Sequence, residues 1–214
     1  MINLNLTIGQ IAFLIVVPTV VVAVIVIVIL LLHRRNLAKK NFKLFYYKRI
    51  YRIAMNNDYY LINNFIFKID DSHVGRIDHI LFADKYIYVM TDSYFNGDII
   101  GKEDDKSVIV LGRDGKKYYD DNPLITNKKL VNKLSVITGI NASLVIGICI
   151  INDNCQYGIQ TSNKSFYYIQ SNKLKALIKA IESRNIGTIN KEQLANAVKA
   201  IDKLNRRKKS GERK

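Results

Sequence analysis

The first 32 residues contain no ionisable side chain, and residues 11–32 are an almost unbroken run of Ile, Val, Leu, Ala and Phe that only Pro18 and Thr19 interrupt. A helix rises about 1.5 Å per residue, so this run would reach about 33 Å. The hydrocarbon core of a bilayer is about 30 Å thick, and the run therefore predicts a membrane-spanning helix. A cleaved signal peptide would have a basic start, a shorter apolar core and a small-residue cleavage site, and the sequence has none of these.

Positive charges directly after this run predict its orientation. No acidic residue precedes Asp58, and positive residues collect on the cytoplasmic side of a membrane span. We therefore expect a single-pass protein of a bacterial cell membrane, with residues 1–10 outside and residues 33–214 in the cytoplasm. The cations of this cluster are Arg34, Arg35, Lys39, Lys40, Lys43, Lys48, Arg49 and Arg52.

The net charge of +15 comes mainly from the two flanks of the cytoplasmic part. The first flank is the cluster above, and the second is residues 206–214, which we expect to be a disordered tail containing Arg206, Arg207, Lys208 and Lys209. Residues 53–205 carry only +2. The flanking cations are candidates for contact with anionic lipid headgroups or with DNA or RNA, and a protein partner is equally compatible with them.

The residues that most often carry chemistry are few in this chain. Cys149 and Cys155 cannot form a disulfide framework or a four-cysteine zinc site, and we expect buried free thiols. His33, His73 and His79 have no metal-ligand spacing and are expected to be solvated or packed. Motifs typical of nucleotide hydrolysis, dinucleotide binding, serine hydrolysis and zinc proteolysis do not occur.

The periodicity of the remaining chain predicts an α/β fold with a mixed sheet flanked by helices over residues 56–170. A basic, aromatic-rich juxtamembrane helix over residues 33–55 precedes this core. Strands rich in Ile, Val, Phe and Tyr are expected, with a hairpin around residues 112–115. The expected strands are residues 59–69, 74–83, 86–91, 107–111, 116–119, 143–151, 157–160 and 166–169.

Local signals predict the other helices. Asn122 is a typical N-cap, Pro123 suits the first helical position, and Gly139 ends the helix that they begin. Two C-terminal helices are expected over residues 172–183 and 190–204, within a segment of residues 171–205.

Four segments in a particular order resemble the nuclease-related domain (NERD) family, which is part of the restriction-endonuclease-like PD-(D/E)xK group. The resemblance spans roughly residues 41–204 and implies the mixed sheet of that group. The segments are Gly75-Arg76-Ile77-Asp78-His79-Ile80-Leu81, Tyr86-Ile87-Tyr88-Val89-Met90-Thr91-Asp92-Ser93, Gly97-Asp98-Ile99-Ile100-Gly101 and Asn122-Pro123-Leu124.

The resemblance also implies what the site should contain. In the family, an Asp and a Glu on adjacent strands hold Mg²⁺ against the scissile phosphate, and a Lys helps to activate water. Asp78 matches the Asp, but Thr91 and Ser93 stand at the Glu and Lys positions of Glu-x-Lys. Thr126 stands at the Gln of Asn-Pro-x-x-Gln, and the Glu of the first helix has no equivalent.

The leading hypothesis is therefore a domain without nuclease catalysis or cofactor, in which Asp78 is a remnant and the domain binds nucleic acid or a partner. The first alternative is a residual Mg²⁺-dependent nuclease that uses Asp78 with Asp92, Asp98 or the Asp120-Asp121 pair. Because strand side chains alternate, Asp92 should point away from the face of Thr91 and Ser93. The second alternative is a membrane scaffold that recruits another protein.

Overall fold

The computed structural model describes residues 8–68, 73–159, 161 and 164–211, with backbone alone at residues 8–15, 32–38 and 206–211. The chain divides into two compact units, residues 1–42 and residues 43–214, which are described separately.

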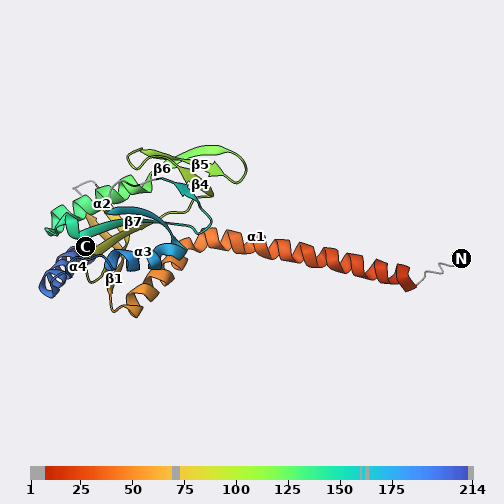
Figure 1. The fold of residues 1–214 in the computed structure, drawn as a ribbon, viewed down its shortest axis with the longest axis horizontal. Coiled ribbons are helices and arrows are strands. Elements are labelled where there is room, and N and C mark those ends of the chain that lie inside the picture. The colour runs from red at the N-terminus through yellow and green to blue at the C-terminus, as the bar shows by residue number, and fades with distance from the viewer. Residues whose placement is uncertain (1–7, 69–72, 160, 162–163, 212–214) are drawn as a thin grey trace. The chain divides into compact units, whose positions relative to one another are not determined.

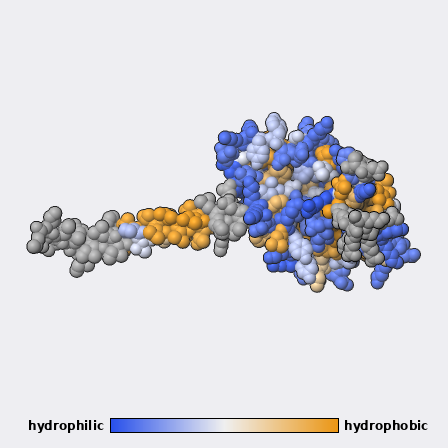
Figure 2. Space-filling model, turned by 180° about the vertical axis from the view of Figure 1, so that it is seen from behind, coloured by the Kyte–Doolittle hydropathy of each residue, from blue (hydrophilic) through white to orange (hydrophobic). Residues whose placement is uncertain are grey.

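Helix α1 (Ile8–Asn56) begins in the first unit and ends in the second. Its backbone leaves helical geometry at Asn41 (φ −113°, ψ 16°), so two helices join there. Figure 2 shows a strongly apolar stretch of this helix, and the side chains of residues 16–31 are exposed in the isolated chain.

The predicted membrane span over residues 11–32 is not supported by the structure. Residues 11–15 and 32 of that span lie outside the described side chains. Among the side chains that are described, no helix is both long enough and apolar enough to cross a membrane.

The main sheet of the second unit has five strands in the order β1-β2-β3-β7-β9 (Figure 1). The first three strands form an antiparallel meander, and the last two add in parallel, which confirms the predicted α/β class and mixed sheet. The strands are β1 (Tyr60–Lys68), β2 (Val74–Phe82), β3 (Ile87–Asp92), β7 (Val145–Ile151) and β9 (Phe166–Gln170).

A second sheet, in the order β6-β5-β4-β8, was not expected from the sequence. Its hairpin of β5 (Ser107–Gly112) and β6 (Lys117–Asp121) confirms the predicted turn. Strand β4 (Gly97–Ile100) was not predicted, because it is short and begins with Gly and Asp, which are depleted in strands. Strand β8 (Tyr157–Gly158) pairs with β4 in parallel.

The helices follow the predicted signals closely. Helix α2 (Pro123–Thr138) is capped by Asn122, whose side chain accepts from the N–H of Leu124, and Gly139 closes it in the left-handed conformation. Helices α3 (Leu174–Glu182) and α4 (Lys191–Gly211) form the C-terminal pair, and two short 3₁₀ helices, η1 (Ala142–Leu144) and η2 (Ser171–Lys173), lie between strands and helices.

The expectation of a disordered tail over residues 206–214 was wrong for residues 206–211, because α4 continues through them. Lys and Arg are good helix formers, so a helix that is already nucleated can extend through a basic segment. Residues 212–214 lie outside the described residues.

Helices cover both faces of the main sheet (Figure 1). On one face, Ile87 and Val89 of β3 join a buried cluster with Leu130 of α2 and Ile201 of α4. On the other face, the hydroxyl of Tyr88 donates to Glu182 of α3. Strand alternation thus decides which side chains of β3 face each helical layer.

Both cysteines are buried free thiols, as predicted. Burial raises the pKa of the Cys149 thiol to about 12, so a reactive thiolate is disfavoured there.

Candidate functional site

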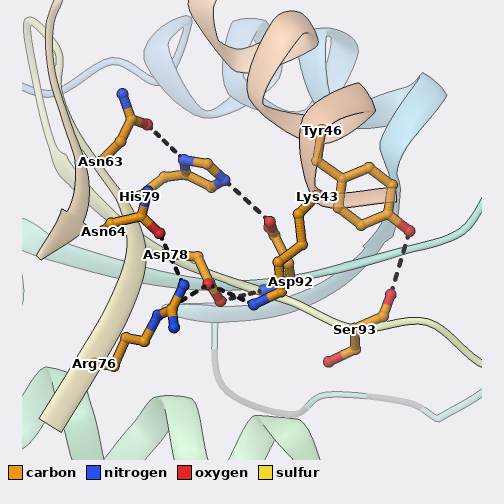
Figure 3. A network of polar contacts seen from close by, with 9 residues as sticks. All are labelled: Lys43, Tyr46, Asn63, Asn64, Arg76, Asp78, His79, Asp92 and Ser93. Atoms are coloured by element: carbon orange, nitrogen blue, oxygen red, sulfur yellow. Dashed lines mark hydrogen bonds and ion pairs between the residues drawn. The ribbon is translucent and has the colours of Figure 1, made fainter. Parts of the chain in front are cut away.

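A pocket of about 470 Å³ lies between the start of the second-unit part of α1 and strands β1, β2 and β3. Figure 3 shows that polar side chains from these four elements converge there. The residues that line the pocket are Lys43, Leu44, Tyr47, Asn63, Asn64, Asp78, His79 and Asp92.

Asp78 is at the centre of this pocket, and both of its carboxylate oxygens are engaged. The ammonium group of Lys43 lies 3.0 Å from Oδ1, and the backbone N–H of Asp92 donates to Oδ2 at 3.0 Å. Nε of Arg76 lies 3.9 Å from Oδ1. Only 12% of the Asp78 side chain is exposed, so these cations compensate a largely desolvated charge.

Helical spacing brings Lys43 to Asp78. Lys43, Tyr46 and Ile50 are at positions i, i+3 and i+7, which share one face of a helix, and Tyr46 and Ile50 are buried against the domain. The Tyr46 hydroxyl donates to the backbone carbonyl of Ser93 at 3.2 Å, which ties the helix to the end of β3. Burial raises the pKa of Tyr46, so this phenol remains protonated as the donor.

Asp92 and His79 form a second buried pair in the same pocket. Nε2 of His79 lies 3.1 Å from Oδ2 of Asp92, and Nδ1 lies 2.6 Å from Oδ1 of Asn63. The exposed fractions of the His79 and Asp92 side chains are 5% and 1%. Burial raises the pKa of Asp92, and the hydrogen bond from His79 opposes this rise. Oδ1 of Asp92 has no hydrogen-bond partner within the described chain.

The side chains that the resemblance predicts at the family's Glu and Gln positions, Thr91 and Thr126, lie away from this pocket. Thr91 points to the α2 face of the sheet, where its hydroxyl donates to Cys149 and accepts from Asn127. Ser93 takes part through its backbone carbonyl, and Thr126 is exposed in the first turn of α2. Thr91 and Asp92 therefore point to opposite faces, as strand alternation requires.

Of the proposed substitute ligands for a metal, Asp92 is the one that shares the pocket with Asp78. Asp98 accepts from the backbone N–H of Gln156 at 2.8 Å, and Asp120 accepts from that of Asp121 at 2.9 Å. Asp98, Asp120 and Asp121 all belong to strands of the second sheet. Among the described residues, no group of three His, Cys, Asp or Glu side chains could hold a metal ion.

The basic candidates from the sequence fall into different environments. Lys43 pairs with Asp78, whereas Arg49 pairs with Asp153 at 2.7 Å. Lys39, Lys40, Lys48 and Arg52 are exposed. The side chains that lie outside the described part are Arg34, Arg35, Arg206, Arg207, Lys208 and Lys209.

Sequence reasoning missed the pairing of Lys43 with Asp78, since Lys43 was grouped with the flanking cations. The spacing of Lys43, Tyr46 and Ile50 could have indicated this pairing, because it places all three on one helix face. Tyr46 and Ile50 are residue types that usually face a core, so Lys43 should face the domain too.

Comparison with known proteins identifies the domain. The model of the nuclease-related domain matches residues 42–152, which is more than half of the chain. No curated protein matches. Among solved structures, the crystal structure of a protein of unknown function, AF1548, is 10% identical, with 73% of this chain and 78% of that chain covered and a TM-score of 0.33. The chain belongs to the nuclease-related domain (NERD) family.

Proposed function

We propose that this NERD domain binds nucleic acid without cleaving it by metal catalysis. The observation that carries the proposal is the position of the Lys43 ammonium group, 3.0 Å from the Asp78 carboxylate. An internal cation thereby already neutralises the carboxylate that a divalent metal would need as a ligand.

The engagement of both Asp78 oxygens disfavours a metal ion. Mg²⁺ requires near-octahedral oxygen ligands and is usually held by one or two carboxylates. An ion at Asp78 would compete with Lys43 for Oδ1, while Oδ2 already accepts from the backbone of Asp92. The Glu-x-Lys positions, Thr91 and Ser93, supply neither a carboxylate nor an ammonium group as compensation.

The same arrangement favours phosphate binding. Lys43 and Arg76 converge on Asp78, but 50% and 55% of their side chains remain exposed. Exposed guanidinium and ammonium groups beside a carboxylate can still attract phosphodiesters, and the resulting affinity depends strongly on salt. The exposed Lys48 adds a further positive charge on the second-unit part of α1.

The test is binding of labelled single-stranded DNA, duplex DNA and RNA by the full chain in a non-ionic detergent. It is run over a salt series with Mg²⁺ present, and the products are separated on a gel. We expect salt-dependent binding of uncut nucleic acid. The double variant Lys43→Ala/Arg76→Ala should bind at least about tenfold more weakly, since each phosphate contact adds to the electrostatic affinity. Lys133→Ala, an exposed cation on α2, is the matched control.

Removal of residues 206–214 separates the domain from its basic tail. Binding that persists in this truncated chain supports the domain as the binding surface, whereas binding that disappears assigns it to the tail. Absence of binding in the intact chain would favour the scaffold function, in which a protein partner is recruited.

A second candidate function is a residual Mg²⁺-dependent nuclease. It is favoured by the buried, unpartnered Oδ1 of Asp92 in the same pocket as Asp78 and Lys43, which together provide two carboxylates and a lysine. Metal-dependent cleavage that is lost in Asp78→Ala and in Asp92→Asn would establish this function and refute the first proposal.

We also propose, from the sequence, that residues 11–32 anchor the protein in a cell membrane with residues 33–214 in the cytoplasm. The support is the uncharged apolar run followed by the basic cluster. Membranes are washed with alkaline carbonate and then with detergent. Release by carbonate alone would contradict an integral anchor, and reporter fusions at each end test the orientation.

A further inference from the structure

A second pocket, of about 290 Å³, lies against α1 and contains no acidic lining residue. Two arginines and a lysine line it, together with two asparagines and a serine. The lining residues are Arg49, Arg52, Ile53, Asn56, Ser171, Asn172 and Lys175.

This pocket is distinct from the Asp78 pocket. The two share no lining residue. Successive residues of an α-helix are about 100° apart, so Arg52, nine residues after Lys43, projects from the opposite flank of α1. A ligand in one pocket therefore does not require a ligand in the other.

Arg49 is fixed in place before any ligand binds. Its guanidinium group contacts both carboxylate oxygens of Asp153, at 2.7 and 2.8 Å, and also the hydroxyl of Ser171. Asp153 in turn accepts from the Ser171 hydroxyl and from the backbone N–H of Asn172, each at 2.8 Å. Arg49 therefore largely compensates the negative charge of Asp153.

Arg52 and Lys175 have no such partner. Both are exposed, and neither makes a hydrogen bond or ion pair within the described part of the chain. They line the same pocket from two different elements, α1 and α3, so the fold places two uncompensated positive charges at one pocket, where they repel each other. An anion between them would relieve this repulsion.

We propose that this pocket binds a phosphate group. Arg52 offers a planar fork of N–H donors, Lys175 an ammonium group, and Asn56 and Asn172 amide donors, which together suit the several acceptor oxygens of a phosphate. The group belongs to a free phosphate ester or to a lipid headgroup that ends in a phosphate, because both present the same terminal oxygens.

Calorimetric titration of the full chain in a non-ionic detergent tests the proposal with three probes, namely inorganic phosphate, pyrophosphate and the short-chain lipid dihexanoyl phosphatidic acid. The variant Arg52→Gln/Lys175→Gln removes both unpaired charges and leaves Arg49, with its structural contacts, intact. We expect at least about tenfold weaker binding of the probe that binds the unsubstituted chain. Lys133→Gln controls for loss of a surface charge, and a thermal melt confirms that each variant is folded.

The outcomes separate the sources of the phosphate. Binding of phosphate or pyrophosphate that is lost in the double variant indicates a free phosphate ester. Binding confined to the phosphatidic acid, and lost in the same variant, indicates a lipid headgroup. No binding of any probe, or equal loss in Lys133→Gln, overturns the proposal. Lys43 and Arg76 are unchanged in these variants, so failure here is distinguishable from failure of nucleic-acid binding at Asp78.

Discussion

Lys43 and Asp78 are 35 residues apart in the sequence, yet the Lys43 ammonium group lies 3.0 Å from the Asp78 carboxylate. The contact joins α1 to the middle strand of the antiparallel meander, at the residue that the resemblance predicts as the family's metal-binding Asp. A lysine from the first helix thus compensates the Asp78 carboxylate. The resemblance predicts a Glu and a Lys near the end of β3, where the chain has Thr91 and Ser93.

Replacement of Lys43 by Met should uncover a weak divalent-cation site. The variant keeps the length of the side chain but leaves Asp78 and Asp92 without the nearest ammonium group, so their negative charges favour a metal more strongly. We expect the melting temperature of Lys43→Met to rise with added Mg²⁺ or Mn²⁺ more than that of the unsubstituted chain. Lys48→Met, on the same helix, is the control, and an equal response of all three proteins would contradict the prediction.

Much of the main sheet could be predicted because its signals are local. Alternating or continuous apolar residues marked β2, β3 and β7, and Asn122, Pro123 and Gly139 marked the two ends of α2. The separate second sheet could not be predicted in the same way, since β4 has four residues and depends on partners far along the chain.

The residue types of the candidate site could be predicted from the sequence more readily than the contacts between them. Strand alternation correctly separated Asp92 from Thr91, because a period of two is fixed by the strand itself. The contact of Asp92 with His79 depends on how β2 and β3 pair. The contact of Lys43 with Asp78 depends on how α1 packs over the sheet. A local pattern does not determine which strands become neighbours or how a helix packs over them.

Asp92 should make the stability of the protein depend on pH. Burial raises its pKa in the folded state, so the folded protein holds this proton to higher pH than the unfolded chain. The corresponding stabilisation is complete below the ordinary aspartate pKa of about 4 and is lost as pH rises through the raised value. Urea unfolding at a series of pH values should show this loss in the unsubstituted protein and a flatter profile in Asp92→Asn. A profile that does not change on substitution would show that another group titrates.

Arg49 should contribute to stability through geometry as well as charge. Its Nη1 atom makes the contacts with both Asp153 and Ser171, and the shorter side chain of Lys would not bring an ammonium group to the same position. Because both side chains of the ion pair are about one-third exposed, we expect Arg49→Ala to lower the free energy of unfolding by about 1–2 kcal/mol. Arg49→Lys should recover less than half of this loss in guanidinium unfolding, and full recovery would show that charge alone is sufficient.

Asn122 should be among the most costly polar side chains to remove. Its side-chain oxygen accepts from the N–H of Leu124 and from the hydroxyl of Tyr168, while its amide donates to the carbonyls of Lys102 and Asp105. Asn122 is 1% exposed, so Asn122→Ala would leave buried partners unsatisfied and remove the cap of α2. We expect a loss of about 3 kcal/mol in the free energy of unfolding.

The companion variant Tyr168→Phe isolates one contact of Asn122. It removes the buried hydroxyl, keeps the aromatic ring and leaves the helix cap and both amide donors in place, so a loss of about 1 kcal/mol is expected. Chemical unfolding of both variants under the same conditions gives the comparison. If Asn122→Ala lowered the free energy of unfolding no more than Tyr168→Phe does, the helix cap and the contacts to the Lys102 and Asp105 carbonyls would contribute nothing to stability. The end of the second sheet would then have to be held by its apolar contacts alone.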